Sequence, residues 1–154
     1  MSAATIIADI AKRARIAART LAASSGVERN QLLLKIADEL EKNLDLILKA
    51  NQLDMDAAKS AGISSSLKDR LLLTEKRVKE MAAATRDIAK LTDPLGKILV
   101  ERNLDNGLNL KQKSVPFGVV GMVYEARPNV TVDAAVILIK SGNAALLRGS
   151  STAA

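Results

Sequence analysis

The feature that most constrains the fold is a strand–helix–strand pattern between residues 119 and 147. Val119–Val123 and Ala144–Leu147 are short runs dominated by apolar residues, which is typical of strands that are buried on both faces. Between them, Pro128 begins an apolar segment that reaches Lys140 and is long enough for a helix. Two strands joined through a helix in about thirty residues predict a βαβ unit with parallel strands. We therefore expect an α/β fold.

The sequence before this unit is predicted to be helical up to residue 92. One apolar stripe at helical spacing consists of Ile6, Ile10, Ala14, Ala17 and Leu21, and a second consists of Leu33, Ile36, Leu40, Leu44, Ile47 and Leu48. We expect the first helix to end near Ser24–Gly26 and one continuous helix to carry the whole second stripe. Ser25 with Glu28 predicts a capping box at its start.

Two further helices and a hairpin are predicted between residues 62 and 116. Ser66 is the expected cap of a short helix over Leu67–Leu72, and Thr74 of a longer one that ends at Asp93–Gly96. Asn106–Gly107 lies between alternating apolar segments, which predicts a hairpin with a type I′ turn. The expected division is a helical region over 1–92, a hairpin and connector over 93–116, and the start of an α/β domain over 117–154.

Composition excludes several kinds of site. The 154 residues contain no Cys and no His, which excludes disulfides, thiolate metal sites and Ser–His triads within them, and we expect no metal. Phe117 and Tyr124 are the two aromatic residues, and the net charge of +6 is spread among acidic residues. Lys12–Arg19 is therefore interpreted as a solvated helix face, and no nucleic-acid partner is expected. No apolar run is long enough for a membrane span. A mitochondrial targeting role for the Arg-rich start remains a minor alternative.

Candidate functional residues follow both predicted strands. Arg127 and Asn129 lie between the first strand and the helix, where ligands of open α/β sheets bind. Arg127 offers a fork suited to phosphate or carboxylate, and Asn129 offers an amide to a developing oxyanion. The alternative is that Asn129 only caps the helix and Arg127 is only solvated. Arg148, Gly149 and Ser150 follow the second strand and could approach a phosphate, although no glycine-rich nucleotide motif accompanies them.

Several segments closely resemble one enzyme family. The segment Glu-Ala-Arg-Pro-Asn-Val-Thr at 125–131 is the most specific of them. The others are Val115–Gly121, the remainder of Tyr124–Asp133, Lys140–Asn143, Leu147–Gly149, Lys35–Leu40 and Asp69–Leu71. Together they are similar to the gamma-glutamyl phosphate reductases of the aldehyde dehydrogenase superfamily, in order and over nearly the whole chain.

The resemblance implies an aldehyde-dehydrogenase-like α/β fold in which residues 117–154 begin a dinucleotide-binding domain. It further implies NADPH-dependent reduction of L-glutamate 5-phosphate to L-glutamate 5-semialdehyde and phosphate, in proline biosynthesis, by a cytoplasmic enzyme that is expected to be a homodimer. Asn129 would stabilise the oxyanion, and Arg148, Gly149 and Ser150 would bind the cofactor. The neutral Ser150, Ser151 and Thr152 fit NADPH better than NADH. Arg127 is our candidate for the substrate phosphate.

One departure from the family concerns the nucleophile. The family's catalytic Cys lies beyond residue 154, so we expect these residues alone to be inactive. We also expect them to be unstable or to aggregate, because a half-built parallel sheet exposes an apolar edge. Three alternatives remain. They are the reductase half of a bifunctional pyrroline-carboxylate synthase, a superfamily member acting on an acyl-CoA, and a non-catalytic fragment or helical module that binds an anion, nucleic acid or a partner.

Overall fold

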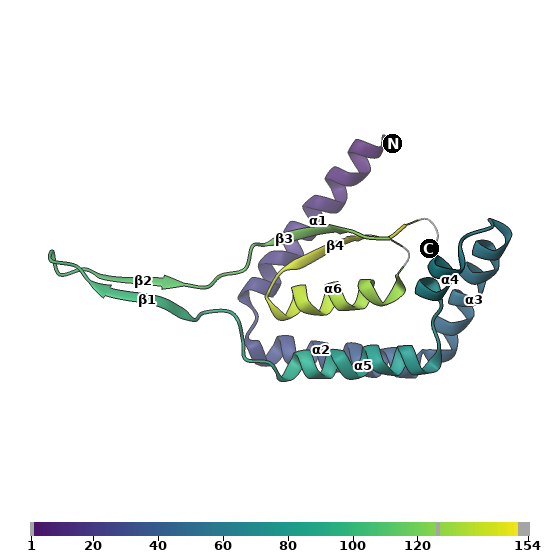
Figure 1. Ribbon diagram of the computed structural model, residues 1–154. Helices are drawn as coiled ribbons and strands as arrows, with labels where there is room; N and C mark the ends of the chain where they lie inside the picture. Colours follow the sequence, from purple (N-terminus) through teal and green to yellow (C-terminus); the bar gives the residue numbers. More distant parts are fainter. Residues whose placement is uncertain (1, 126, 151–154) are drawn as a thin grey trace.

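The computed structural model describes residues 2–125 and 127–150 (Figure 1). Its helices are α1 (Ala3–Ala23), α2 (Gly26–Lys42), α3 (Leu44–Ser60), α4 (Ser65–Leu71), α5 (Glu75–Lys90) and α6 (Pro128–Lys140). Its strands are β1 (Ile98–Asn103), β2 (Asn109–Lys113), β3 (Val119–Val123) and β4 (Ala144–Arg148). The helical region, the hairpin and the α/β unit thus follow one another in the predicted order.

The predicted βαβ unit is confirmed. Strands β3 and β4 are parallel and in direct register, with Val119 opposite Ala144 and Val123 opposite Arg148. Helix α6 packs on one face of this sheet, and α1 contacts both strands on the other. Below α6 lies the pair α2 and α5, so that α6 is covered by helices on the side away from the sheet (Figure 1). Gly142 has a φ of 72° just past the end of α6, the left-handed position that favours glycine.

The prediction that both strands are buried on both faces is wrong for the described residues. Gly121, Met122 and Val123 of β3 are exposed, and Val123 retains 82% of its accessible surface. The residues of β4 are half-buried, except Ala144, which is buried, and Arg148, which is exposed. The sheet described here has two strands, and α1 makes only limited contact with β3. The described residues therefore leave part of the apolar surface of β3 and β4 uncovered.

The first capping prediction is confirmed, but the continuous second helix is not. The Ser25 hydroxyl accepts from the Glu28 N–H at 3.2 Å, and the Glu28 carboxylate accepts from the Ser25 N–H at 2.7 Å. The chain then leaves the helix at Asn43, which has φ −98° and ψ 21°. The Asn43 side chain donates to the Glu39 carbonyl at 2.8 Å, in addition to the backbone bond from the Asn43 N–H to the same carbonyl at 3.0 Å, and α2 ends at this residue. Helix α3 consequently turns towards α4 (Figure 1).

Ser64, and not Ser66, caps the short helix α4. Its hydroxyl accepts from the Leu67 N–H at 3.4 Å. Three successive serines can all act as caps, and packing selects among them, because Ile63 packs against the buried pair Ala58 and Leu71. Thr74 caps α5 as predicted, because its hydroxyl accepts from the Arg77 backbone N–H at 3.2 Å.

Strands β1 and β2 form the predicted hairpin, which extends away from the helices as an exposed ribbon (Figure 1). Its turn is not type I′, because Gly107 has a φ of 85° while no described non-glycine residue has a positive φ. The Leu104 carbonyl accepts from the Gly107 N–H at 2.9 Å, and the Leu104 N–H donates to the Leu108 carbonyl at 2.8 Å. This is a three-residue loop that ends in a left-handed glycine. Asn106 instead accepts from the Leu108 N–H through its side chain, at 3.2 Å.

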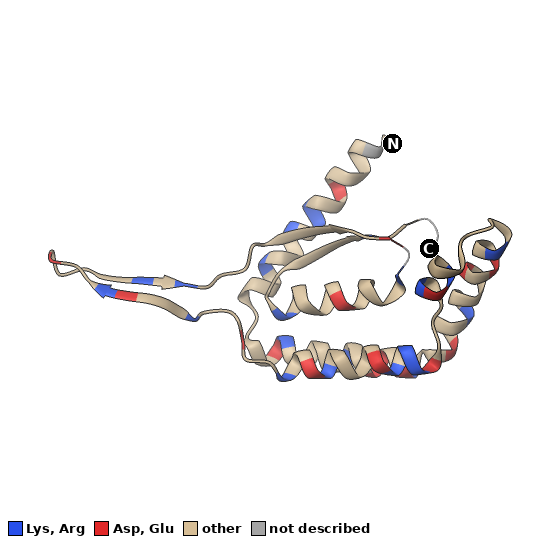
Figure 2. Cartoon of the chain, in the orientation of Figure 1, with Lys and Arg blue, Asp and Glu red and all other residues tan. Residues whose placement is uncertain are grey.

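Charges of both signs are interspersed along α2 and α5 (Figure 2). Arg86 of α5 contacts Asp38 and Glu41 of α2, each at 2.8 Å. Between these helices and α6, the core contains Leu33, Ala89 and Val136. Among the described residues, no helix has the length and hydropathy needed to cross a bilayer.

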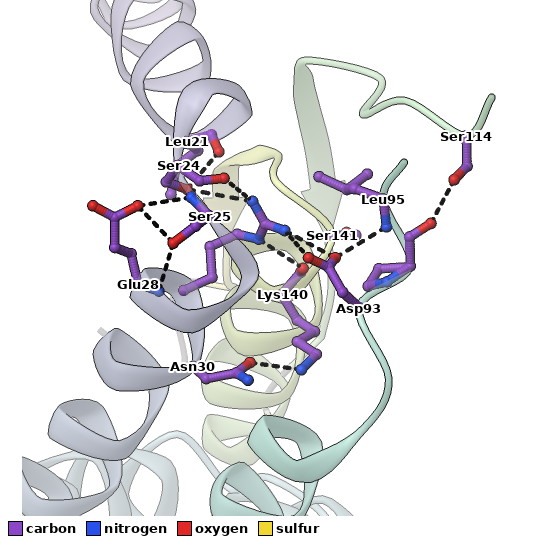
Figure 3. A network of polar contacts seen from close by, with 12 residues as sticks. Leu21, Ser24, Ser25, Glu28, Asn30, Asp93, Leu95, Ser114, Lys140 and Ser141 are labelled. Atoms are coloured by element: carbon purple, nitrogen blue, oxygen red, sulfur yellow. Dashed lines mark hydrogen bonds and ion pairs between the residues drawn. The ribbon is translucent and has the colours of Figure 1, made fainter. Parts of the chain in front are cut away.

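A buried polar network joins the helical region to the α/β unit (Figure 3). Arg29 of α2 is 3% exposed. It donates to the Asp93 carboxylate at 2.7 and 2.8 Å, to the Lys140 carbonyl at 3.2 Å and to the Ser24 carbonyl. Burial alone would raise the pKa of Asp93, but hydrogen bonds from the Leu95 N–H and from Arg29 outweigh it, and the pKa is lowered. The first residue of α2, Gly26, lies so close to Asp93 that an added Cβ would be 2.3 Å from a carboxylate oxygen of Asp93.

Lys140 is the second buried cation of this network. Its Nζ donates to Asn30 Oδ1 at 2.6 Å, to the Ala89 carbonyl at 3.0 Å and to the Leu91 carbonyl at 2.6 Å. All three of its donors are thereby used, and the end of α5 is tied to the end of α6. Burial lowers the pKa of Lys140, while the nearby Asp93 carboxylate opposes this effect.

Candidate functional site

The carboxyl ends of β3 and β4 lie side by side, as the βαβ unit requires. The Tyr124 N–H, just after β3, donates to the Arg148 carbonyl at the end of β4 at 3.1 Å. Arg127 and Asn129 follow the first of these ends, and Gly149 and Ser150 follow the second. The structure thus brings both predicted sets of site residues to one end of the sheet, where ligands of open α/β sheets bind.

At the start of α6, Arg127 is the N-cap residue and makes no side-chain capping bond. Pro128 occupies the first turn, where its missing N–H leaves no helical hydrogen bond unmade. Asn129 lies inside the helix and its Nδ2 donates to Asp133 Oδ2 at 3.1 Å. The alternative in which Asn129 is merely the helix cap is therefore wrong. The Asn129 amide has a second hydrogen, so it can donate one more hydrogen bond.

Arg127 and Asn129 line a cavity of about 410 Å³ between the start of α6 and the helices α4 and α5. We call it the α4–α6 pocket. Its walls contain three arginines and three acidic residues, together with an apolar floor. The lining residues are Asp69, Arg70, Leu72, Leu73, Arg77, Glu80, Met81, Ala84, Arg127, Asn129 and Asp133. The volume falls within the range of small-molecule sites.

A second, shallower depression lies at the ends of the two strands, and we call it the strand-end hollow. It is lined by Val123, Tyr124, Glu125, Arg148, Gly149 and Ser150. All three residues predicted to bind a cofactor therefore line one depression, and Arg148 is exposed there. Ser151 and Thr152, which were also part of that prediction, lie outside the described residues.

Asp133 and Arg70 also line the α4–α6 pocket, although the sequence reasoning did not name them as candidate site residues. Asp133 lies four residues after Asn129, so helical spacing could have indicated that the two side chains meet. Arg70 belongs to the Asp69–Leu71 segment that resembles the family, but only the fold brings it to the start of α6. Within residues 2–125 and 127–150, no group of three His, Cys, Asp or Glu side chains could hold a metal ion.

The α4–α6 pocket and the strand-end hollow are distinct but adjacent. Tyr124 forms part of the hollow, and its hydroxyl lies 2.6 Å from the Thr131 hydroxyl of α6, one turn beyond Pro128. The Asn129 amide and three guanidinium groups line the α4–α6 pocket. Arg148, next to Gly149, lines the strand-end hollow. The arrangement can bind two anionic molecules, such as the two reactants of one reaction, at the same end of the sheet.

Comparison with known proteins gives one consistent family. The chain is 50% identical over 143 residues to a curated gamma-glutamyl phosphate reductase of Halalkalibacterium halodurans, covering 93% of the chain and 34% of that protein. It is 48% identical over 142 residues to the enzyme of the same name from a Nitratiruptor species, covering 92% of the chain and 34% of that protein. No protein-family profile matches the chain.

Solved structures agree with the sequence relatives. The crystal structure of the Thermotoga maritima gamma-glutamyl phosphate reductase matches with a TM-score of 0.90 and 40% identity, over 93% of this chain and 34% of that one. The crystal structure of the Saccharomyces cerevisiae enzyme matches with a TM-score of 0.90 and 39% identity, over 99% of this chain and 38% of that one. The chain therefore spans about one third of the length of these relatives. In sequence and in fold, it is homologous to the N-terminal third of the gamma-glutamyl phosphate reductases.

Proposed function

We propose that this chain is part of an enzyme that reduces L-glutamate 5-phosphate to L-glutamate 5-semialdehyde, with NADPH as the hydride donor. In the net reaction, hydride adds to the acyl carbon, the bond from that carbon to the phosphate oxygen breaks, and inorganic phosphate leaves. The observation that carries the proposal is the 50% identity over 93% of the chain to an enzyme named for this substrate. The likeness at a TM-score of 0.90 to a solved structure of the same name agrees with it.

Asn129 is the residue that we assign to the reacting carbonyl. Hydride addition places negative charge on the carbonyl oxygen, and an amide N–H directed at that oxygen stabilises the charge. The 3.1 Å bond from Asn129 Nδ2 to Asp133 fixes which way the amide points. This supports the assignment, because a donor held in place needs no reorganisation during the reaction.

The strand-end hollow is the proposed cofactor site, and its residues fit the phosphate groups of NADPH. Arg148 provides positive charge at the end of β4, and Gly149 has no side chain to obstruct an approaching phosphate. Ser150 is neutral, so it does not repel a 2′-phosphate as an acidic side chain would. When bound, NADPH supplies the hydride. The chain's own residues hold its adenosine end and align the acyl carbon.

The thiol nucleophile implied by the resemblance is not among these 154 residues. The proposal therefore concerns the complete enzyme, which we expect to be a homodimer. These residues contribute the oxyanion donor, the beginning of the cofactor site and one wall of the substrate site.

The test uses the full-length gene product and follows the reaction in reverse. L-Glutamate 5-semialdehyde, phosphate and NADP⁺ should together give an increase in absorbance from NADPH. Omission of phosphate should abolish it, because phosphate is the group that returns to the acyl carbon. NADP⁺ reduction without any need for phosphate would contradict the proposal, as would complete inactivity.

A further inference from the structure

Two arginines in the α4–α6 pocket have no ionic partner among the described residues. They are Arg70, on α4, and Arg127, before α6. The third arginine, Arg77, is engaged: it donates to the Leu72 carbonyl at 2.6 Å and to the Asp69 carboxylate at 3.0 Å. The pocket therefore contains two guanidinium groups from different elements that are not neutralised by its own acidic residues.

The acidic residues of the pocket do not pair with Arg70 or Arg127. Asp69 binds Arg77 at 3.0 Å, Asp133 accepts from Asn129 at 3.1 Å, and Glu80 lies 3.9 Å from Lys76. Each acid thus has a partner other than Arg70 or Arg127. An unpaired guanidinium in a concave site presents a planar fork of donors that matches a carboxylate or a phosphate.

The proposed substrate has two anionic groups, one for each of these cations. L-Glutamate 5-phosphate carries an acyl phosphate at one end and an α-carboxylate at the other. In an extended conformation the carboxylate carbon lies about 5 Å from the acyl carbon. Arg127 is two residues from Asn129, which we assign to the acyl carbonyl. Arg70 reaches the same pocket from α4, so one cation belongs to the reacting end and the other is contributed by a separate wall.

We infer that Arg70 binds the α-carboxylate of the substrate and thereby selects an α-amino acid derivative over a simple aldehyde or acyl phosphate. The inference rests on the proposed function and adds to it a specificity-determining residue from α4. Arg127 remains the contact for the phosphate. The ammonium group of the substrate lies within the same pocket, where Glu80 provides negative charge.

The test measures the reverse reaction of the full-length gene product with Arg70→Ala, Arg70→Lys and Arg127→Ala. In this direction the carboxylate and the phosphate are on different molecules, so their sites can be separated. Arg70→Ala should raise the KM for L-glutamate 5-semialdehyde about 10- to 100-fold, the scale of a lost charge-assisted hydrogen bond. The KM values for phosphate and for NADP⁺ should not change. Arg127→Ala should instead raise the KM for phosphate.

Two substrate analogues provide a readout that a purely structural role would not move. The unmodified enzyme should prefer 5-oxopentanoate, which keeps the carboxylate, over 4-aminobutanal, which lacks it. Arg70→Ala should remove this preference, and Arg70→Lys should restore part of it, because lysine keeps the charge but not the fork. Arg15→Ala on the exposed face of α1 serves as the control and should behave as the unmodified enzyme.

An unchanged KM for the semialdehyde in Arg70→Ala, with the other activities intact, would overturn the inference. So would a raised KM for phosphate instead. If Arg70→Ala does not fold, absence of any carboxylate preference in the unmodified enzyme would overturn it equally. Complete lack of phosphate-dependent NADP⁺ reduction in the unmodified enzyme would refute the proposed function itself, which separates the two failures.

Discussion

Replacement of Arg29 by Met tests whether the buried network holds the helical region to the α/β unit. Methionine keeps most of the length and apolar contact of the side chain but removes every donor. The Asp93 carboxylate, the Ser24 carbonyl and the Lys140 carbonyl would each lose a partner. Loss of one member of a buried ion pair costs about 3–5 kcal/mol, since the other member remains without compensation. Asp93 is partly exposed at 38%, so we expect the lower half of that range.

The assay is a urea titration of the full-length gene product, followed by far-UV circular dichroism. With a slope of about 3 kcal/mol/M, a loss of about 3 kcal/mol lowers the midpoint by about 1 M. The matched control is Arg15→Met on α1, which removes an exposed arginine and should change the stability by less than about 0.5 kcal/mol. Equal midpoints for Arg29→Met and Arg15→Met would refute the reasoning, because burial is what distinguishes the two positions.

The remaining predictions concern the site and pH. Arg148→Glu in the full-length gene product should weaken NADPH binding far more than NADH binding, and equal losses would exclude a contact with the 2′-phosphate. Asn129→Ala should lower kcat about 100-fold or more, the scale of one oxyanion donor, and unchanged turnover would remove Asn129 from the mechanism. The pKa of Asp93 is lowered in the folded chain, so its contribution to stability is complete above the ordinary Asp pKa of about 3.9 and is lost as the pH falls through the lower folded value. Asp93→Asn should therefore flatten the acid limb of a stability–pH profile measured by urea titration.

The regular elements could be predicted because their local signals agree with the packing. Ser25 and Thr74 cap helices where their spacing indicates, and the β3–α6–β4 unit follows from length and apolar content. Asn43 could not be anticipated, because the apolar stripe continues through it. The side-chain bond from Asn43 to Glu39 and the packing of α3 on α4 accompany the end of the helix there. At the hairpin, Gly107 was identified correctly, but the loop length depends on which leucines pair.

The site was predictable only as far as the chain itself brings residues together. Arg127 and Asn129 are two positions apart, and their location after a strand is a local property of the βαβ unit. Arg70 reaches them through the packing of α4 and α5 against α6, which no local pattern contains. The same holds for Arg29 and Asp93, which are 64 residues apart in sequence. Long-range pairing of polar groups is the information that the sequence did not disclose.

The contact between Gly26 and Asp93 reverses a common rule of protein engineering. Alanine exceeds glycine in helix propensity by about 1 kcal/mol, so Gly26, at the first position of α2, looks like an obvious site for a stabilising substitution. A methyl group there would lie 2.3 Å from an Asp93 carboxylate oxygen and would displace the carboxylate that pairs with Arg29. The adjacent Val27 is 66% exposed and carries no such restriction. A library that varies the start of α2 should therefore accept many residues at Val27 and few besides glycine at Gly26. Secondary structure alone assigns both positions to the same helical turn.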